Sequence, residues 1–346
     1  KHHIPNNVAE ISFGPLPLTS GKCISSVTLR YELTGPPGAP VILVCHALTG
    51  NHRTVGTEEN PGWWSGLIGP HKYIDTTQYQ VLTFNVLGGC NGSTGPTSLN
   101  PKTNKPYRRS FPEITIRNMV TAQYMALQKL NISKLYAVIG GSLGGMQVLE
   151  WGICYPEMME KLIAFAVTPV FSDYGIGFNH IAEQAIKTDP AWNNGNYPLN
   201  TPLKGLEIAR MIGMVTYRSV DLFTERFQRQ QSETGFSVSS YLNYQGAKLA
   251  NRFDPNSYLY LLNAMNHHDI GHGRGGWKKA ARLLRKPTLL ISYEKDLIYE
   301  PHIIRSFAEQ LPQGHYFHVE TNFGHDGFLT EFEKWGDEVA SFLHGA

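Results

Sequence analysis

The residues best suited to chemistry form one short segment, Gly140-Gly141-Ser142-Leu143-Gly144. It fits the pattern G-x-S-x-G and stands between an apolar β-branched run and a stretch typical of a helix. In that setting the turn is so tight that the flanking positions accept almost no side chain, and the serine hydroxyl faces the positive end of the helix. The alternative is a glycine-rich turn with an incidental serine. The strand and helix around the segment favour Ser142 as a nucleophile.

A base and an acid must accompany this serine. A serine hydroxyl attacks an acyl carbon only when a histidine, oriented by a carboxylate, removes its proton. Behind such a turn the chain order is serine, acid, histidine. Asp296 and His325 follow in that order, each just after a predicted strand, where open α/β sheets gather their active sites. Glu294 is a rival acid, and we favour Asp296 because of its position.

Acyl chemistry also needs backbone donors for the developing oxyanion. Each such donor typically contributes about 3 kcal/mol to the barrier. The N–H of Leu143 directly follows the nucleophile and supplies one donor. The second is expected from the loop after the third strand, His46-Ala47-Leu48-Thr49-Gly50, and we assign it to Leu48. The alternative for this segment is an ordinary loop at the end of a strand.

A histidine-rich cluster, His267-His268-Asp269 with His272, has residue types that bind metals. Neighbouring His267 and His268 would point in different directions on a helix. His268 and His272 would share a face only if the helix continued, and the adjacent glycines indicate that it ends. We therefore expect no metal site and assign the cluster to a helix end or a lid loop.

The elements that must position these residues follow an α/β pattern. Short apolar runs alternate with helical stretches from about residue 41 to 169, and the pattern resumes after residue 286. Continuous apolar runs are typical of strands covered on both faces, whereas the alternating segment 27–33 suggests an antiparallel edge strand. The predicted strands of the first kind are 41–45, 80–84, 135–139, 161–167, 288–292 and 315–319.

Between about residues 169 and 285 the strand signal stops. Apolar residues at helical spacing over 206–230 predict a helix, and Asp254-Pro255 is typical of an N-cap followed by proline in the first helical turn. This block interrupts a sheet that resumes after it. We interpret residues 170–285 as a helical lid inserted into a core of residues 1–169 and 286–346. Together with the serine turn, this predicts the α/β-hydrolase fold, a mainly parallel central sheet flanked by helices.

Composition excludes several classes of partner. The chain has 346 residues, 41% of them hydrophobic, which is enough to bury a full core. A net charge of +2 gives no reason to expect nucleic acid or an anionic membrane as a partner. The first thirty residues contain no signal-peptide core, and we expect a cytoplasmic enzyme. The four cysteines show no C-x-x-C spacing, so free thiols are expected, with Cys45 and Cys154 buried, and disulfides are the alternative.

Several longer segments are specific enough to indicate a family. The most specific are Gly140-Gly141-Ser142-Leu143-Gly144-Gly145-Met146-Gln147, Thr216-Tyr217-Arg218-Ser219 and His325-Asp326-Gly327-Phe328-Leu329. With these segments the chain resembles homoserine O-acyltransferases of the homoserine O-acetyltransferase type over nearly its whole length. The chain departs from the family at Gln228, where glycine is common, and at Gly327, where alanine is common.

The resemblance implies a ping-pong reaction of methionine biosynthesis. Acetyl-CoA, a co-substrate rather than a bound cofactor, would acylate Ser142, and L-homoserine would then attack the acyl-enzyme with His325 as base. The resemblance also implies that Arg210 pairs with the carboxylate of the amino acid and that Asp326 takes its ammonium group. It further implies a homodimer formed through the lid helices.

Other reactions remain open on the same scaffold: a succinyl donor, serine or another alcohol as acceptor, or hydrolysis by Ser142. Against water at about 55 M, an acceptor at about 1 mM needs an advantage of roughly 10⁵, and a bound hydroxyl can reach effective molarities of about 10⁵–10⁸ M. A snug acceptor site therefore suffices if the lid excludes bulk water. A non-catalytic interaction module is disfavoured, because the triad and oxyanion candidates are complete.

Overall fold

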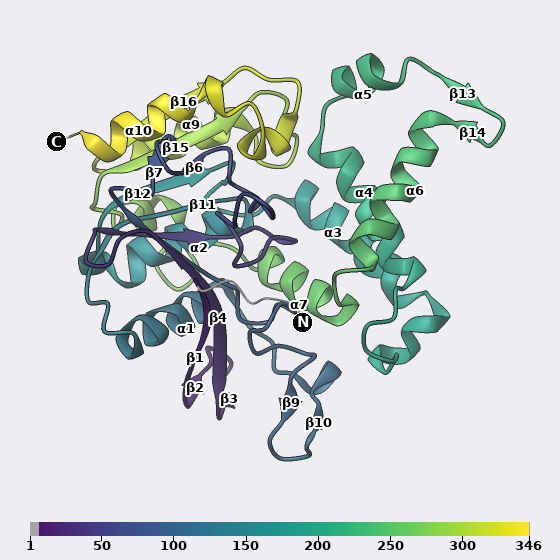
Figure 1. Cartoon of the computed structure of the whole chain (residues 1–346), viewed down its shortest axis with the longest axis horizontal. Helices are drawn as coiled ribbons and strands as arrows, with labels where there is room; N and C mark the ends of the chain where they lie inside the picture. Colours follow the sequence, from purple (N-terminus) through teal and green to yellow (C-terminus); the bar gives the residue numbers. More distant parts are fainter. Residues whose placement is uncertain (1–6, 346) are drawn as a thin grey trace.

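The computed structural model describes residues 7–345 and is built on an eight-stranded sheet (Figure 1). The strand order is β1-β4-β8-β5-β11-β12-β15-β16, in which β1–β4 and β4–β8 are antiparallel and the remaining pairs are parallel. The prediction of an α/β-hydrolase fold with a mainly parallel sheet is therefore confirmed. The strands of the sheet are β1 Val8–Phe13, β4 Val27–Thr34, β5 Val41–Cys45, β8 Gln80–Phe84, β11 Leu135–Gly141, β12 Met159–Phe165, β15 Thr288–Tyr293 and β16 Gly314–Val319.

Two strands differ clearly from their predicted bounds. The strand expected over residues 135–139 ends two residues later, at Gly141. The strand expected over residues 161–167 begins and ends two residues earlier, at Met159–Phe165. The reason is Ala166, whose φ of 49° lies in the left-handed region and ends the extended backbone. The short remaining strands pair outside the main sheet: β2 Leu16–Pro17, β3 Cys23–Ile24, β6 Ile68–Gly69, β7 Ile74–Asp75, β9 Leu99–Asn100, β10 Lys105–Pro106, β13 Gln231–Ser232 and β14 Gly235–Phe236.

Helices cover both faces of the sheet, which explains the continuous apolar runs. Within β5, Leu43 and Cys45 belong to one buried cluster, whereas Ile42 and Val44 belong to another. The first cluster includes side chains of α1 Ile116–Lys129, α2 Leu143–Cys154 and α9 Pro301–Gln310. The second includes side chains of α10 Gly336–His344. A strand buried on both sides has no polar face, so its sequence does not alternate.

Between β12 and β15 the chain forms a mostly helical insertion beside the sheet, at the right of Figure 1. Its helices are α3 Asp173–Lys187, α4 Lys204–Tyr217, α5 Val220–Phe227, α6 Ser237–Ala250, α7 Pro255–Asn266 and α8 Trp277–Ala281. The helix predicted over 206–230 is wrong as a single element. Arg218 is extended between α4 and α5, and the Ser219 side chain caps α5 by accepting from the N–H of Leu222. Asp254 caps α7 as predicted.

The insertion leaves and rejoins the core through a narrow neck. The N–H of Ile270 donates to the carbonyl oxygen of Pro169 at 3.0 Å, and the N–H of Phe171 donates to that of His268 at 2.9 Å. Residues 171–268 therefore form an excursion whose two ends are hydrogen-bonded to each other. Beyond the neck, α8 returns to the core, where the ring of Trp277 lies edge-on to Phe307 of α9 at 6.0 Å.

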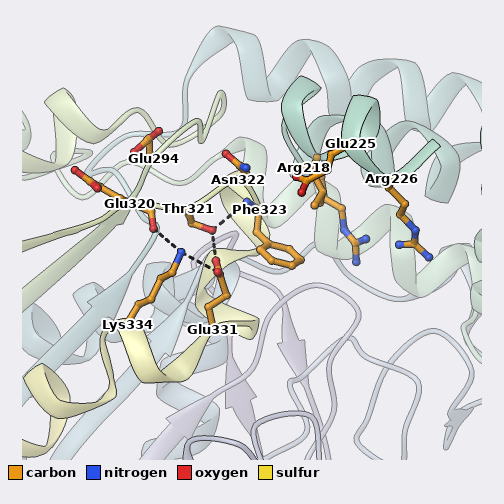
Figure 2. A pocket seen from close by; sticks show the side chains of 11 residues that line it. Arg218, Glu225, Arg226, Glu294, Glu320, Thr321, Asn322, Phe323, Glu331 and Lys334 are labelled. Carbon is orange, nitrogen blue, oxygen red and sulfur yellow. Dashed lines mark hydrogen bonds and ion pairs between the residues drawn. The ribbon is translucent and has the colours of Figure 1, made fainter. Parts of the chain in front are cut away.

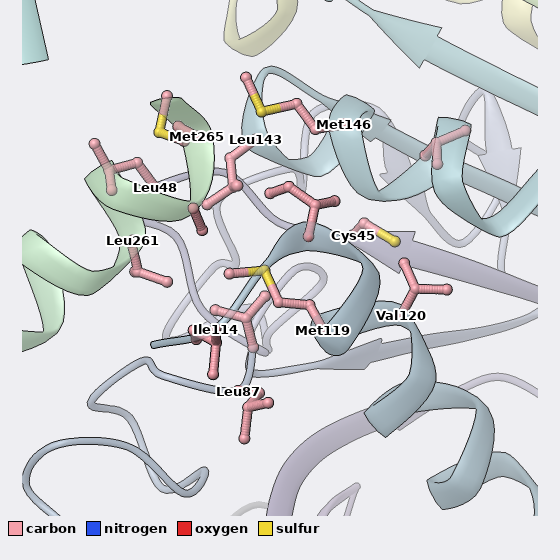
Figure 3. Packing of buried hydrophobic residues seen from close by; sticks show 14 of the residues in the cluster. Cys45, Leu48, Leu87, Ile114, Met119, Val120, Leu143, Met146, Leu261 and Met265 are labelled. Atoms are coloured by element: carbon pink, nitrogen blue, oxygen red, sulfur yellow. The ribbon is translucent and has the colours of Figure 1, made fainter. Parts of the chain in front are cut away.

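One part of the core fixes the two backbone segments expected to bind an oxyanion. Leu48 and Leu143 lie in the same buried cluster as Met146 and as Leu261 and Met265 of α7, which lie at the left of Figure 3. Leu48 is 6% exposed and Leu143 is fully buried. Because close-packed interiors resist displacement, burial of both side chains holds their main chains in place.

The cysteines and the hydropathy of the helices add two smaller findings. All four cysteines are free thiols, and Cys45 is buried as predicted. Cys154, the last residue of α2, is only partly buried, so its predicted burial is wrong, and its Sγ lies 3.6 Å from a carboxylate oxygen of Glu150. Across residues 7–345, no helix is long and apolar enough to cross a membrane.

Candidate active site

Ser142 occupies a strained turn between β11 and α2. Its φ of 56° and ψ of −122° are unusual for a residue with a side chain. Its N–H donates to the carbonyl oxygen of Phe165 at 3.0 Å, so the end of β12 holds the turn. A serine in this conformation at the strand–helix junction has the geometry of a nucleophile elbow.

The glycine after this turn is required by close approach of two backbones. A β-carbon on Gly144 would lie 2.0 Å from the carbonyl oxygen of Cys45, the last residue of β5. No side chain fits at that distance. The first turn of α2 therefore abuts the start of the loop that carries Leu48.

Asp296 and His325, the expected acid and base, form a buried hydrogen-bonded pair. The Nδ1 of His325 lies 2.8 Å from Oδ2 of Asp296, and both side chains are buried. Oδ1 of Asp296 accepts the N–H groups of Ile298 and Tyr299, at 3.1 and 2.9 Å, which fixes the carboxylate. Nε2 of His325 is left as the nitrogen that can serve the nucleophile. The rival acid, Glu294, is more exposed and lies 3.6 Å from Lys295.

The environment of His325 favours its charged form. Burial on its own would lower the pKa of His325. The negative charge of Asp296, its hydrogen bond and the charge of Asp326 outweigh burial and raise the pKa above the ordinary value. A base whose protonated form is stabilised in this way is suited to accept a proton during the reaction.

Tyr299 lies against both Ser142 and His325, and no sequence pattern predicted a role for it. Its hydroxyl lies 3.5 Å from Ser142 Oγ, and its ring stacks on His325 with centroids 4.7 Å apart. Within residues 7–345, Ser142 Oγ forms no hydrogen bond with His325. In ligand-free enzymes such contacts are often long and shorten only when substrate binds. The position of Tyr299, three residues after the acid, was the only available signal.

The N–H groups of the two expected oxyanion donors have no acceptor in the described part of the chain, and one side chain connects the two main-chain segments that carry them. Among the described residues, neither the Leu48 N–H nor the Leu143 N–H has a hydrogen-bond acceptor. The buried amide of Gln147 donates to the carbonyl oxygens of His46 and Leu143, at 3.2 and 3.3 Å. Gln147 in turn accepts from Gln123 at 2.8 Å. Gln147 was not predicted to have a role, and it connects the loop after β5 to the first turn of α2.

His46 stabilises the same loop as a neutral residue. Its Nε2 accepts the N–H of Val86 at 3.0 Å, so the proton is on Nδ1, which lies 2.8 Å from the Ala47 carbonyl oxygen. Burial lowers the pKa of His46 to about 4, and the contact with Ala47 only partly opposes this. An uncharged imidazole that forms two hydrogen bonds thus fixes the start of the loop that carries Leu48.

Arg210 and Asp326, which the family resemblance implies to bind an amino acid, lie on two different elements near the proposed triad. Arg210 is on α4, and its Nη1 lies 3.4 Å from Thr49 Oγ1. Its Nε is buried and has no hydrogen-bond partner within the described residues. Asp326 lies in the short 3-10 helix η4 Gly324–Leu329. Burial is the main cause that raises the pKa of Tyr217, and the charges of Arg210 and Asp326 also act on it, so both charges lie near this residue. The Tyr217 ring lies 5.7 Å from that of His325.

The histidine-rich cluster has other partners. The ring of His268 is buried, with its Nε2 2.8 Å from the carbonyl oxygen of Thr168, and His267 Nδ1 lies 2.9 Å from that of Asn263. The helix ends at Asn266, before the glycines that were expected to end it. In the part of the chain that the structure describes, no three His, Cys, Asp or Glu side chains are grouped to hold a metal ion. The cluster belongs to the neck.

Comparison with known proteins gives four informative likenesses. Residues 40–332 match the family model of the alpha/beta hydrolase fold. A homoserine O-acetyltransferase of Carboxydothermus hydrogenoformans is 41% identical, over 96% of this chain and 94% of that protein. The crystal structure of homoserine O-acetyltransferase from Bacillus anthracis has a TM-score of 0.91 at 27% identity and covers 98% of both chains. Esterase E22 has a TM-score of 0.88 at 28% identity, over 97% of this chain and 100% of that one. Proteins named as transferases and as esterases thus share this scaffold.

Proposed function

Because the chain belongs to the homoserine O-acetyltransferase family of α/β-hydrolase-fold enzymes, we propose that it transfers an acetyl group from acetyl-CoA to the hydroxyl of L-homoserine. The observation that carries this proposal is the unpartnered, buried Nε of Arg210, which together with Asp326 lies near Tyr217, beside His325. A buried guanidinium nitrogen without an acceptor is suited to bind a carboxylate. An enzyme that only hydrolyses esters needs no such grip.

In the first half of the reaction, Ser142 Oγ attacks the thioester carbon of acetyl-CoA. His325 Nε2 takes the hydroxyl proton, and the charge of Asp296 stabilises the imidazolium. The N–H groups of Leu48 and Leu143 bind the oxyanion of the tetrahedral intermediate. The carbon–sulfur bond then breaks, and His325 gives its proton to the departing sulfur, so that CoA leaves as the thiol. The product is an acetyl ester on Ser142.

In the second half, the hydroxyl of L-homoserine replaces the serine hydroxyl in this geometry. Its proton passes to His325 as its oxygen attacks the acetyl carbon, and Ser142 regains the proton when its ester bond breaks. Arg210 pairs with the carboxylate of the acceptor and Asp326 with its ammonium. The product is then released, and the free enzyme is back in its starting protonation state.

Burial of the site supports transfer over loss of the acetyl group to water. Ser142 and His325 are only 6% and 4% exposed. Water reaches such a site in small numbers, whereas a bound hydroxyl has an effective molarity of about 10⁵–10⁸ M. The α4 segment that carries Arg210 therefore both recognises the acceptor and restricts solvent.

The test is CoA release from acetyl-CoA with and without L-homoserine, with succinyl-CoA and L-serine as comparisons. Release that depends on homoserine and yields O-acetylhomoserine is expected, and Ser142→Ala should abolish it. Ser232→Ala, which changes an exposed serine of β13, is the matched control. Better use of succinyl-CoA or serine would leave the mechanism standing and change only the specificity.

The likeness to esterase E22 favours a second candidate, a Ser142-dependent ester hydrolase. Both functions predict loss of activity in Ser142→Ala. They differ in the response to the acceptor. Release of CoA at the same rate with and without any amino acid would overturn the transferase proposal and favour the hydrolase.

We further propose that the enzyme forms a homodimer through the inserted helices. Val215 of α4 and Tyr244 of α6 are large apolar side chains that are 49% and 62% exposed, and Ile208 of α4 is 41% exposed. The helices α4 and α6 pack against each other, and large exposed apolar side chains are typical of protein interfaces. This supports the dimer implied by the family resemblance.

A further inference from the structure

Asp326, which the proposed function assigns to the substrate ammonium, already has a cationic partner. Nε of Arg218 donates to its Oδ2 at 3.0 Å. The two side chains are 20% and 13% exposed, so the pair is largely shielded from solvent, unlike a surface ion pair. An incoming ammonium group therefore meets a carboxylate that has one oxygen occupied.

Arg218 is held at its backbone as well as at its guanidinium. It lies at the break between α4 and α5, and the next residue, Ser219, donates its hydroxyl to the carbonyl oxygen of Asn322. A β-carbon on Gly324, whose φ is +60°, would lie 3.1 Å from the carbonyl oxygen of Tyr217. The break between the helices is therefore docked on the loop that carries His325 and Asp326, and Arg218 has little freedom to leave.

A surface depression of about 720 Å³ lies on the outer side of Arg218 (Figure 2). Arg218, Glu225 and Arg226 line it on the side of the insertion, and Glu331 and Lys334 line it on the side of the core (Figure 2). The Lys334 ammonium is paired with Glu331 at 2.8 Å. Arg226 lies over the ring of Tyr241 at 4.4 Å and, among residues 7–345, forms no ion pair. Two arginines thus share one depression, but only Arg218 reaches the carboxylate of Asp326.

The second oxygen of Asp326 is available for a ligand. Its Oδ1 has no hydrogen-bond donor within the described residues, whereas Oδ2 is bound to Arg218. A carboxylate fixed through one oxygen presents the other in a defined direction without a further loss of rotational freedom on binding. If Arg218 were absent, a mostly buried carboxylate would lose its charged partner, which is costly and allows the group to turn toward solvent.

We propose that Arg218 is the positioning residue that gives the enzyme its selectivity for acceptors with an amino group. It holds Asp326 through Oδ2 and leaves Oδ1 for the ammonium of the acceptor. This inference rests on the proposed function, because it assumes that an amino acid binds between Arg210 and Asp326. The carboxylate and hydroxyl of the acceptor are recognised elsewhere, so loss of Arg218 affects acceptors that carry an amino group more than those that lack one.

The experiment compares two acceptors, L-homoserine and 4-hydroxybutyrate, which share the hydroxyl and the carboxylate but differ in the amino group. In Arg218→Met, kcat/KM for homoserine is expected to fall about 10- to 100-fold, mainly through KM, while that for 4-hydroxybutyrate changes less than about 3-fold. Arg218→Lys should restore part of the selectivity, since lysine supplies the charge without the planar fork. Arg226→Met is the matched control and should keep the wild-type ratio of the two acceptors.

Asp326→Asn supplies the second arm. It should lower the selectivity as Arg218→Met does, and the double variant should lose no more than either single variant, because both act on one contact. Equal losses for the two acceptors in Arg218→Met would show a merely structural role, and no loss for either acceptor would show that Arg218 has no role. Either result would overturn the proposal. Failure of the proposed function itself is distinguishable, because the wild-type enzyme would then release CoA without any dependence on homoserine.

Discussion

The ring of Tyr299 lies on the ring of His325, with centroids 4.7 Å apart and planes inclined by 22°. The same carboxylate serves both residues, because Asp296 binds His325 through Oδ2 and accepts the Tyr299 N–H through Oδ1. The loop after β15 therefore supplies the acid, orients the base and covers the base with an aromatic ring. This arrangement limits the rotation of the imidazole before any substrate binds.

Replacement of Tyr299 should separate the role of its ring from that of its hydroxyl. Tyr299→Phe keeps the ring, so transfer should remain within about 5-fold of wild type despite the lost contact with Ser142. Tyr299→Ala removes the support of His325 and leaves a cavity, so stability should fall by about 3–5 kcal/mol. Its kcat should fall about 100-fold, as expected when reacting groups lose their alignment. Steady-state kinetics and urea unfolding measure both effects. Equal losses in the two variants would show instead that the hydroxyl takes part in the reaction.

Gln147 should affect the rate through the oxyanion site. In Gln147→Leu the carbonyl oxygens of His46 and Leu143 lose their shared donor. We expect a kcat about 10- to 100-fold lower, since complete loss of one oxyanion donor costs about 10²–10³. Gln184→Leu, at an exposed position of α3, is the control. A normal kcat in an unstable Gln147→Leu protein would assign the network to folding alone.

Each member of the proposed triad was predicted from a local pattern. Ser142 is part of a pentapeptide whose glycines answer a steric demand, seen here at Gly144. Asp296 and His325 each follow a strand, and parallel strands bring their carboxyl ends to one edge of the sheet. Tyr299 and Gln147 were missed for the opposite reason. Tyr299 contacts residues 142 and 325, and Gln147 contacts residue 46 on another strand end. These partners lie far away in the sequence, where no periodicity indicates a contact.

The break between α4 and α5 was missed although the sequence contains a signal for it. Apolar residues continue at helical spacing through Val215, Leu222 and Phe227, so periodicity alone predicts one helix. Ser219 followed by Asp221 has the composition of an N-cap with an acid in the first turn, which marks a new helix. The pairing of Arg218 with Asp326, by contrast, depends on how the insertion docks on the core, and no sequence pattern contains that information.

The acid limb of the pH profile should report the charge of Asp326. Burial lowers the pKa of His325, and the charges of Asp296 and Asp326 raise it by more. Asp326→Asn removes one of the raising charges, so the pKa falls and the base stays unprotonated to lower pH. The acid limb of acyl-enzyme formation with p-nitrophenyl acetate should therefore move to lower pH. Asp337→Asn, on α10, should leave the limb in place. An upward shift in Asp326→Asn would contradict the assignment.

Acid should destabilise the fold through buried neutral histidines. Burial is the main cause that lowers the pKa of His46 and of His52 to about 4, from an ordinary value of 6.5. Below pH 6.5 the unfolded chain binds protons that the folded chain does not, so stability is greatest above that pH and falls toward pH 4. The loss at pH 4 reaches about 3 kcal/mol for each histidine. Urea midpoints between pH 4 and 7 measure it. His52→Gln should flatten the decline, and a constant wild-type midpoint would contradict the assignment.

A charge placed on the exposed apolar surface of the inserted helices should separate the proposed dimer. Val215→Asp puts a carboxylate where an apolar contact is expected, and desolvation of an unpaired charge strongly disfavours association. Leu99→Asp is the matched control, since Leu99 is 60% exposed but lies on the β9–β10 hairpin. Sedimentation should show a dimer for wild type and Leu99→Asp and a monomer for Val215→Asp. A monomeric wild-type protein would overturn the proposal.

The neck between β12 and β15 makes residues 171–268 a transplantable cassette. Its two ends meet through the backbone hydrogen bonds of Ile270 with Pro169 and of Phe171 with His268. Segments of other lengths can therefore close on the same pair of stems without disturbing the strand register, since longer loops cost little additional closure entropy. Gene recombination at this neck would keep the strands that carry the proposed triad and exchange the part proposed to choose the acceptor, together with α7, whose Leu261 and Met265 pack in the cluster of Leu48 and Leu143. Reciprocal grafts between this enzyme and an esterase of the same scaffold would carry that choice with them.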